Sequence, residues 1–250
     1  MKDRVVVVPG NTTAEWVQKT LGFNPDPLQR LMLDTPVKRG VLNCSRQWGK
    51  STVTAAKAVH NAWTNKDSLT IVVSPTGRQS GELVRKAARF AGKLGIQPKG
   101  DGDNEISLEF PNGSRIIGLP GTEATVRGFS AVSLLLVDEA TRVSDELYLA
   151  VRPMLAVSGG TVWLMSTPCG KRGFFWEVWE NGGPGWERIR ATGAECPRIP
   201  GEFLKEEMSA MGERMFRQEY CCEFTEAVGA LFDRDTIESA FSSDITPLKL

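Results

Sequence analysis

The stretch CSRQWGKST, residues 44–52, constrains the fold of this chain more than any other feature. It follows an apolar run at 39–45 that indicates a buried strand, and it precedes a helical pattern over 50–63. Where a strand turns tightly into a helix, backbone N–H groups and the helix dipole together favour an anion. The spacing fits a phosphate-binding loop (Gly, four residues, then Gly-Lys-Ser/Thr), except that Cys44 stands where the first Gly would be.

This loop predicts chemistry for individual residues. Lys50 would contact the β- and γ-phosphates of a nucleotide, and Ser51 would bind Mg²⁺. Cys44 is small enough to leave the loop open, and Gly49 lies nearer the closest approach to the phosphates. The candidate nucleotide-binding residues are therefore Ser45, Arg46, Gln47, Trp48, Gly49, Lys50, Ser51 and Thr52. The alternative is a strand, turn and helix that contain Gly-Lys-Ser by chance.

The ends of two later strands carry polar groups that suit the same site. LLLVDEA places Asp138 and Glu139 at the carboxyl end of a buried strand, which is where ligands bind in open parallel sheets. Asp138 could hold Mg²⁺ beside Ser51, and Glu139 could polarise the attacking water. The next strand ends in Ser166 and Thr167, whose hydroxyls could contact a γ-phosphate or a catalytic water. Two acids before a helix N-terminus, or a polar strand end before Pro, are the plainer alternatives.

Apolar runs that alternate with helical patterns predict an α/β fold, a mainly parallel sheet flanked by helices. Thr12 and Glu15 suggest a capping box for a first helix that ends at Leu21. Two short segments around Pro111 predict a hairpin at the sheet edge. Further strands are expected at 68–75, 133–140, 160–168 and 186–192, and further helices at 79–94, 171–180 and 201–211.

Composition excludes several classes of protein. Lys plus Arg equals Asp plus Glu, 30 against 30, which argues against the broad positive surface of a dedicated nucleic-acid binder. The five cysteines form no C-x-x-C pair, so neither a disulfide framework nor a zinc site is expected. No apolar run of about 18 residues is present, so we expect no membrane contact and a cytoplasmic setting.

Together, CSRQWGKS, LLLVDEA followed by STP, and the upstream NPDPLQ resemble the ATPase domain of a phage large terminase subunit, over residues 13–224. The resemblance implies a RecA-like (ASCE-type) P-loop NTPase with a small C-terminal lid subdomain. In that family an Arg-Gln pair stands before the last Gly of the loop in place of the first Gly. Arg46 and Gln47 match this variant, so the Cys44 substitution is expected.

The resemblance also implies residue roles. Asp138 would be the Mg²⁺-side carboxylate and Glu139 the catalytic one, while Ser166 and Thr167 would couple hydrolysis to movement. Gln29 resembles a glutamine that reads adenine. Two arginines compete for the transition state: Arg46 would act on its own subunit's ATP and Arg127 on a neighbour's, since a guanidinium suits either place.

The same resemblance implies cofactors, partners and domains. ATP and Mg²⁺ would drive packaging of double-stranded DNA into a procapsid, with the portal, the small terminase subunit and a homo-oligomeric ring as partners in the bacterial host cell. The isolated chain is expected to be a monomer. We expect an ATPase core at 1–170, a lid at 171–225 that closes with a strand at 217–224, and a linker at 226–250 to an absent nuclease domain, so no nuclease activity.

Two alternatives stay open. A helicase or translocase would share the loop, the acids and STP, but it needs a second RecA-like domain. A non-catalytic nucleotide-binding scaffold would not need Glu139. Phosphate release with and without Glu139→Gln separates these classes.

Overall fold

The computed structural model describes residues 12–119, 128–225 and 240. Its centre is a seven-stranded sheet in the order β3-β4-β2-β5-β6-β1-β7. All neighbouring strands pair in parallel except β3, which forms an antiparallel hairpin with β4 at one edge. The strands are β1 (Arg39–Cys44), β2 (Leu69–Val73), β3 (Ser107–Glu109), β4 (Arg115–Leu119), β5 (Leu134–Asp138), β6 (Thr161–Ser166) and β7 (Glu187–Ala191). The predicted mainly parallel α/β fold is confirmed.

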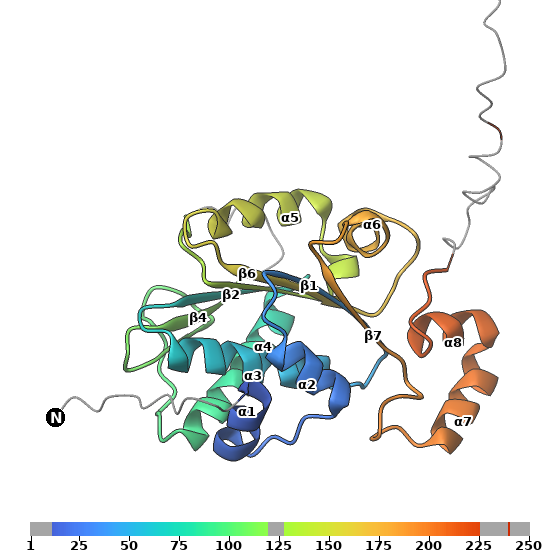
Figure 1. Cartoon of the computed structure of the whole chain (residues 1–250), viewed down its shortest axis with the longest axis horizontal. Coiled ribbons are helices and arrows are strands. Elements are labelled where there is room, and N and C mark those ends of the chain that lie inside the picture. The colour runs from blue at the N-terminus through green and yellow to red at the C-terminus, as the bar shows by residue number, and fades with distance from the viewer. Residues whose placement is uncertain (1–11, 120–127, 226–239, 241–250) are drawn as a thin grey trace, which may run out of the picture.

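Helices cover both faces of this sheet (Figure 1). One face packs against α1 (Thr13–Leu21), α2 (Pro27–Asp34), α3 (Lys50–Thr64) and α4 (Gly77–Lys93). The other face packs against α5 (Asp145–Val151) and α6 (Gly173–Asn181). Successive strand residues point to opposite faces, so Val41 enters the α5–α6 core while Leu42 enters the α1–α4 core. Burial on both faces explains why the central strands are continuous apolar runs.

Two further helices, α7 (Gly201–Met211) and α8 (Glu213–Glu219), form a hairpin beside β7 (Figure 1). The boundary expected at residue 170 falls inside the sheet layer, because α6 covers one face and β7 pairs in parallel with β1. Only the α7–α8 hairpin stands outside that layer. In the described part of the chain, no helix is long and apolar enough to cross a membrane.

The helix and strand boundaries agree with expectation at most places and differ at four elements. The helix α4 begins two residues before the expected Gln79 because the Thr76 hydroxyl accepts from its N–H and caps the helix. The helices α2 and α5 were not expected at all. The closing strand expected at 217–224 is wrong, since Arg217–Glu219 end α8 and the following residues form no strand.

Candidate functional site

The loop between β1 and α3 turns at the carboxyl edge of the sheet. Gly49 is the N-cap of α3 and has φ 95°, and Gln47 has φ 60°. These values favour glycine, and a Cβ added at Gly49 would lie 3.0 Å from Gln29 Nε2. The chain therefore needs Gly at this position, both for its backbone conformation and for its close packing against α2.

Side chains behind the loop hold its Trp48 carbonyl. Gln29 Nε2 donates to Trp48 O at 3.1 Å, and an Arg198 NH2 group donates to the same oxygen. Asp26 and Gln29 form a reciprocal capping box at the start of α2, and Arg198 also donates to Asp26 Oδ2 at 2.9 Å. Gln29 is 1% exposed, so its amide serves the loop and the helix cap in this structure.

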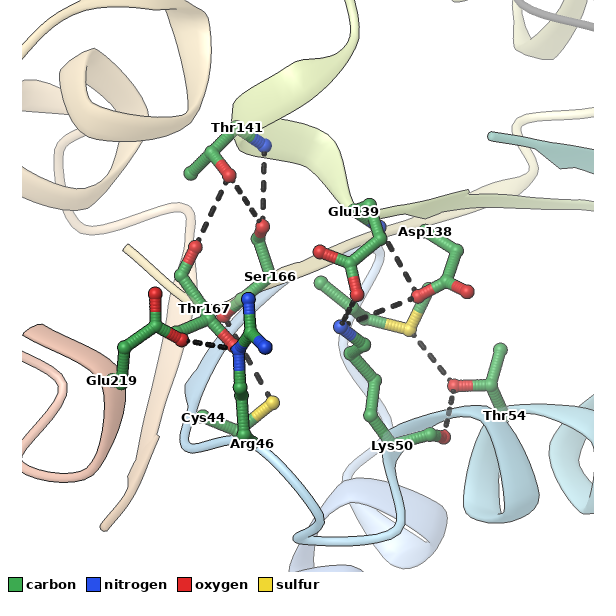
Figure 2. A network of polar contacts seen from close by, with 11 residues as sticks. Cys44, Arg46, Lys50, Thr54, Asp138, Glu139, Thr141, Ser166, Thr167 and Glu219 are labelled. Atoms are coloured by element: carbon green, nitrogen blue, oxygen red, sulfur yellow. Dashed lines mark hydrogen bonds and ion pairs between the residues drawn. The ribbon is translucent and has the colours of Figure 1, made fainter. Parts of the chain in front are cut away.

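The front of the loop is held from the other side. Ser45 N donates to Ala191 O at 2.9 Å at the end of β7, and Arg46 N donates to Glu219 O at 3.1 Å at the end of α8. The Arg46 guanidinium is 2.5 Å from Glu219 Oε2, as Figure 2 shows. Glu219 therefore ties the α7–α8 hairpin to the loop.

Lys50 meets the two carboxylates that end β5. Its Nζ is 2.5 Å from Glu139 Oε1 and 3.7 Å from Asp138 Oδ1 (Figure 2). Burial alone would lower the pKa of Lys50, but the neighbouring carboxylates outweigh it and hold that pKa above its usual range. Burial raises the pKa of Asp138, and the Lys50 charge opposes that rise. Glu139 has φ 51°, a strained backbone for a residue with a side chain.

β6 lies between β1 and β5 in the sheet, so its carboxyl end lies beside the phosphate-binding loop and the two carboxylates. The hydroxyls of Thr141 and Ser166 are 2.7 Å apart, and Thr141 Oγ1 donates to Thr167 O at 3.1 Å. Figure 2 shows Thr141 bridging from the residues after β5 to the end of β6. These bonds connect the segment carrying Glu139 to the segment carrying Ser166 and Thr167.

Cys44, at the position of the missing first Gly, is fully buried beneath the loop. Its Sγ is 3.9 Å from Ser166 O. Burial raises the pKa of this thiol to about 12. The side chain is therefore a neutral packing group, and it does not obstruct the loop above it.

A cavity of about 400 Å³ opens over the loop, a size that suits a small-molecule ligand. The predicted residues that line it are Ser45, Arg46, Gln47, Trp48, Gly49, Lys50, Ser51, Thr52, Glu139 and Thr167. Asp138 and Ser166 are buried just behind it. Gln29 lies beneath the loop rather than in the cavity wall, and Arg127 lies outside the described residues.

Several lining residues were missed from the sequence. These are Gln79 and Lys86 of α4, Thr141 and Arg142 after β5, Pro168 and Cys169 after β6, and Gln218 and Glu219 of α8. Thr141 follows DEA directly and could have been inferred from the strand end. Nothing local marks Gln218 or Glu219, which lie about 170 residues beyond the loop.

The oxygen groups at the cavity fit Mg²⁺. The hydroxyl-bearing Ser51 lines the cavity, and Asp138 ends β5 beside Lys50. Among the described residues no group of three or more His, Cys, Asp or Glu side chains could hold a metal. That pattern suits Mg²⁺, which commonly binds one or two protein oxygens together with nucleotide phosphates rather than an all-protein cage.

Comparison with known proteins gives one family. A family model described as terminase large subunit, T4likevirus-type, N-terminal, matches residues 41–239. The large terminase subunit of Thermus virus P23-45 is 24% identical over 247 residues, which covers 85% of this chain and 51% of that protein. The subunit of Escherichia phage T5 is 24% identical over 56% of this chain and 34% of its own length. The chain thus spans about half the length of its Thermus virus relative.

Solved structures share the fold. The ATPase domain of the Thermus phage P74-26 large terminase has a TM-score of 0.73 at 22% identity, covering 86% of this chain and all of that domain. A large terminase from a thermophilic bacteriophage, in complex with ATP-gamma-S, has a TM-score of 0.63 at 13% identity, covering 85% of this chain and 51% of that one. At these identities the likeness establishes the architecture.

Proposed function

This chain belongs to the terminase large-subunit family of the T4likevirus type, and we propose that it is the ATP-hydrolysing part of a motor that packages double-stranded DNA into a procapsid. One observation carries the proposal. Lys50, in the loop that follows β1, lies against Glu139 and Asp138 at the end of β5, beside a cavity large enough for a nucleotide. Loop, cation and paired carboxylates are the parts that phosphoryl transfer requires.

The Lys50–Glu139 contact would hold the proposed catalytic base, Glu139, in an ion pair until a nucleotide binds. A γ-phosphate oxygen would compete for the Lys50 ammonium, because charge-assisted bonds to phosphate are strong. Once Lys50 turns to the phosphate, Glu139 is free to orient and polarise the attacking water. The Lys50–Glu139 pair would therefore exchange for a Lys50–phosphate pair at each turnover.

The metal would be held by the Ser51 hydroxyl and the Asp138 carboxylate. Bound Mg²⁺ neutralises charge on the β- and γ-phosphates. Asp138 would supply negative charge opposite that metal, and the ammonium of Lys50 opposes the rise in pKa that burial causes at this carboxylate. The loop N–H groups and the α3 N-terminus would bind the remaining phosphate oxygens.

The other residues take supporting roles. Arg46, in the loop, would stabilise the transition state of its own ATP, and Arg127 would serve the ATP of a neighbouring subunit. Ser166 and Thr167 would transmit hydrolysis through Thr141, which hydrogen-bonds to both segments. Gln29 would recognise adenine after its amide leaves the Trp48 carbonyl, or it would act only by holding the loop.

Partners follow from the family. DNA, the portal of a procapsid, a small terminase subunit and further copies in a ring are the proposed partners, and the α7–α8 hairpin is the proposed lid. Its contact with the loop through Glu219 and Arg46 gives nucleotide binding a route to the hairpin. We propose that the isolated chain is a monomer in the host cytoplasm.

Glu139→Gln tests the catalytic proposal. The variant removes one charge and keeps the side-chain shape, so ATP binding should persist while phosphate release falls by a factor of about 10² to 10⁴. Binding is measured by titration with a fluorescent ATP analogue. A variant that hydrolyses ATP at the parent rate would show that Glu139 is not the catalytic carboxylate.

A further inference from the structure

A second pocket lies at the opposite, amino-terminal edge of the same sheet. It has a volume of about 350 Å³ and forms where β1 and β6 begin. Its wall combines cations with aromatic and small apolar residues: Lys38, Arg39, Tyr148, Arg152, Leu155, Ala156, Gly159, Gly160, Val162 and Trp186. We call this the basic pocket. β1 runs from this pocket to the phosphate-binding loop, so the two sites are separated by the length of the strand.

Within the part of the chain that the structure describes, the cations of the basic pocket pair with no carboxylate. Of the described residues that line the basic pocket, none is acidic, and Lys38, Arg39 and Arg152 form no ion pair within the described part of the chain. Glu187 is close in sequence to Trp186, but it pairs with Gly40 and so points to the other face of the sheet from Arg39. Three exposed cations around one recess create a positive potential that favours an anion.

Packing against aromatic rings and backbone hydrogen bonding position the cations of the basic pocket. The Arg152 guanidinium lies 5.5 Å from the centre of the Tyr148 ring, and that ring stacks on Phe174 with centroids 4.0 Å apart. Val162 N donates to Lys38 O at 2.9 Å, which fixes the backbone at the start of β1. A guanidinium positioned over an aromatic ring loses less entropy when it binds a carboxylate.

The rest of the wall is apolar. Leu155, Ala156, Val162 and Trp186 supply it, and the adjacent Val157 is 81% exposed. A free inorganic anion would gain nothing from these groups. A peptide that places an apolar side chain next to an acidic one would use both parts of the wall.

We propose that the basic pocket binds an acidic peptide segment of a protein partner, with its carboxylates on Arg39, Arg152 and Lys38 and a neighbouring apolar side chain against Leu155 and Trp186. Arginine binds carboxylates through two parallel hydrogen bonds, which suits this arrangement. A DNA duplex fits less well, because duplex binding uses a run of cations along the backbone and the three cations here cluster in one recess. The chain as a whole carries no net charge.

A labelled twelve-residue peptide with four Glu and two Leu among Gly and Ser is a direct probe. Fluorescence anisotropy should show saturable binding to the whole chain, and replacing the four Glu with Gln should abolish it. The triple variant Lys38→Glu, Arg39→Glu, Arg152→Glu should weaken binding by at least about 100-fold, since two charged hydrogen-bonded contacts are each worth roughly tenfold or more.

A matched control reverses three exposed cations elsewhere: Lys66→Glu, Arg89→Glu, Lys99→Glu. It changes the net charge equally and should keep peptide binding near the parent affinity, while both triple variants should keep ATP turnover. Equal weakening by the two variants would overturn the proposal, because it would mean attraction to net charge alone. Binding of a 12-bp DNA duplex instead of the peptide, or of the Gln peptide as tightly as the Glu peptide, would overturn it too. Self-association would overturn it as well. In that case the parent chain would bind no peptide but would sediment as a larger species, and only the Lys38, Arg39, Arg152 triple variant would return it to the monomer. The occupant of the basic pocket would then be a second copy of the chain.

Discussion

At the carboxyl edge of the sheet Lys50 contacts two carboxylates, whereas at the amino edge Lys38, Arg39 and Arg152 contact none among the described residues. One strand connects these settings, since β1 begins at Arg39 and leads into the loop that carries Lys50. At the carboxyl edge the charges are balanced inside the chain. At the amino edge no described carboxylate pairs with these cations, which is why the same kind of residue supports two different inferences.

The two edges also differ in how a sequence reveals them. A loop of fixed spacing and a pair of acids at a strand end form a pattern with a mechanism, so the carboxyl edge could be assigned residue by residue. The amino edge gathers Lys38, Trp186 and the Tyr148–Arg152 pair from three separate segments. No local spacing joins these segments, and the fold brings them together.

The largest expected effect is on ATP turnover, and it should differ between the lysines of the two edges. Lys50→Ala should lower ATP turnover by at least about 10²–10³-fold, because it removes a preorganised cation from the reacting phosphates. Lys38→Ala should leave turnover at the parent rate. Phosphate release by both purified variants checks this, and a comparable loss in the Lys38 variant would mean that the two edges are not independent.

β1 itself offers the next test. A Cβ added at Gly40 would lie 2.5 Å from the Trp163 ring, which is fully buried. Gly40→Ala should therefore reduce the free energy of unfolding by about 1–3 kcal/mol through overpacking. Urea unfolding measures this loss, and because both edges share the strand, nucleotide binding and peptide binding should fall together over the urea range in which the variant unfolds.

Gly92→Ala is the matched control for that stability measurement. Gly92 lies within α4, and an added Cβ would have nothing within 4 Å. Urea unfolding should show unchanged or slightly higher stability, because alanine restricts the unfolded chain more than glycine does. Equal destabilisation by both substitutions would show that contact with Trp163 is not the cause.

Much of the fold was predictable because buried strands and capped helices carry local signals. The sequence predicted β1, β2, β5 and β6 from their apolar runs, and it also placed a strand at β7. It missed α2, although Asp26, Pro27 and Gln29 are typical of a helix start. These residues were interpreted only as part of the NPDPLQ motif of the family. The strand expected at 217–224 came from the family resemblance, and in this chain the first of these residues end α8 instead. Arg198 and Glu219, which hold the loop, were invisible because their partners are at least 150 residues away.

Gln29→Ala should have a smaller effect on nucleotide binding. Comparing ATP with GTP shows whether Gln29 recognises adenine. Arg198 still donates to the Trp48 carbonyl in this variant, so the loop keeps one of its two side-chain ties. Loss of one hydrogen bond predicts a decrease in ATP affinity of about two- to tenfold. An equal loss for ATP and GTP would assign Gln29 to the loop alone, while a loss confined to ATP would assign it to adenine.

The smallest expected effect concerns Arg127, which lies outside the described residues and which we assign to a neighbour's ATP. A guanidinium supplied by another subunit is worth about 10³–10⁵ in rate elsewhere. An isolated chain gains nothing from it, so Arg127→Ala should leave the slow turnover of the monomer nearly unchanged. Arg46→Ala should impair the same monomer, because Arg46 lines the cavity of its own subunit.

Mixing subunits distinguishes the two arginines under assembly conditions. Subunits with Glu139→Gln cannot hydrolyse their own ATP, but they still carry Arg127. Added to Arg127→Ala subunits in a shared ring, they should restore the acceleration that assembly gives, because each supplies the guanidinium its neighbour lacks. The same mixture made with Arg46→Ala should show no rescue, since that guanidinium acts only within its own subunit. An Arg127→Ala monomer with crippled turnover would place Arg127 at its own nucleotide and make the assignment to a neighbour wrong.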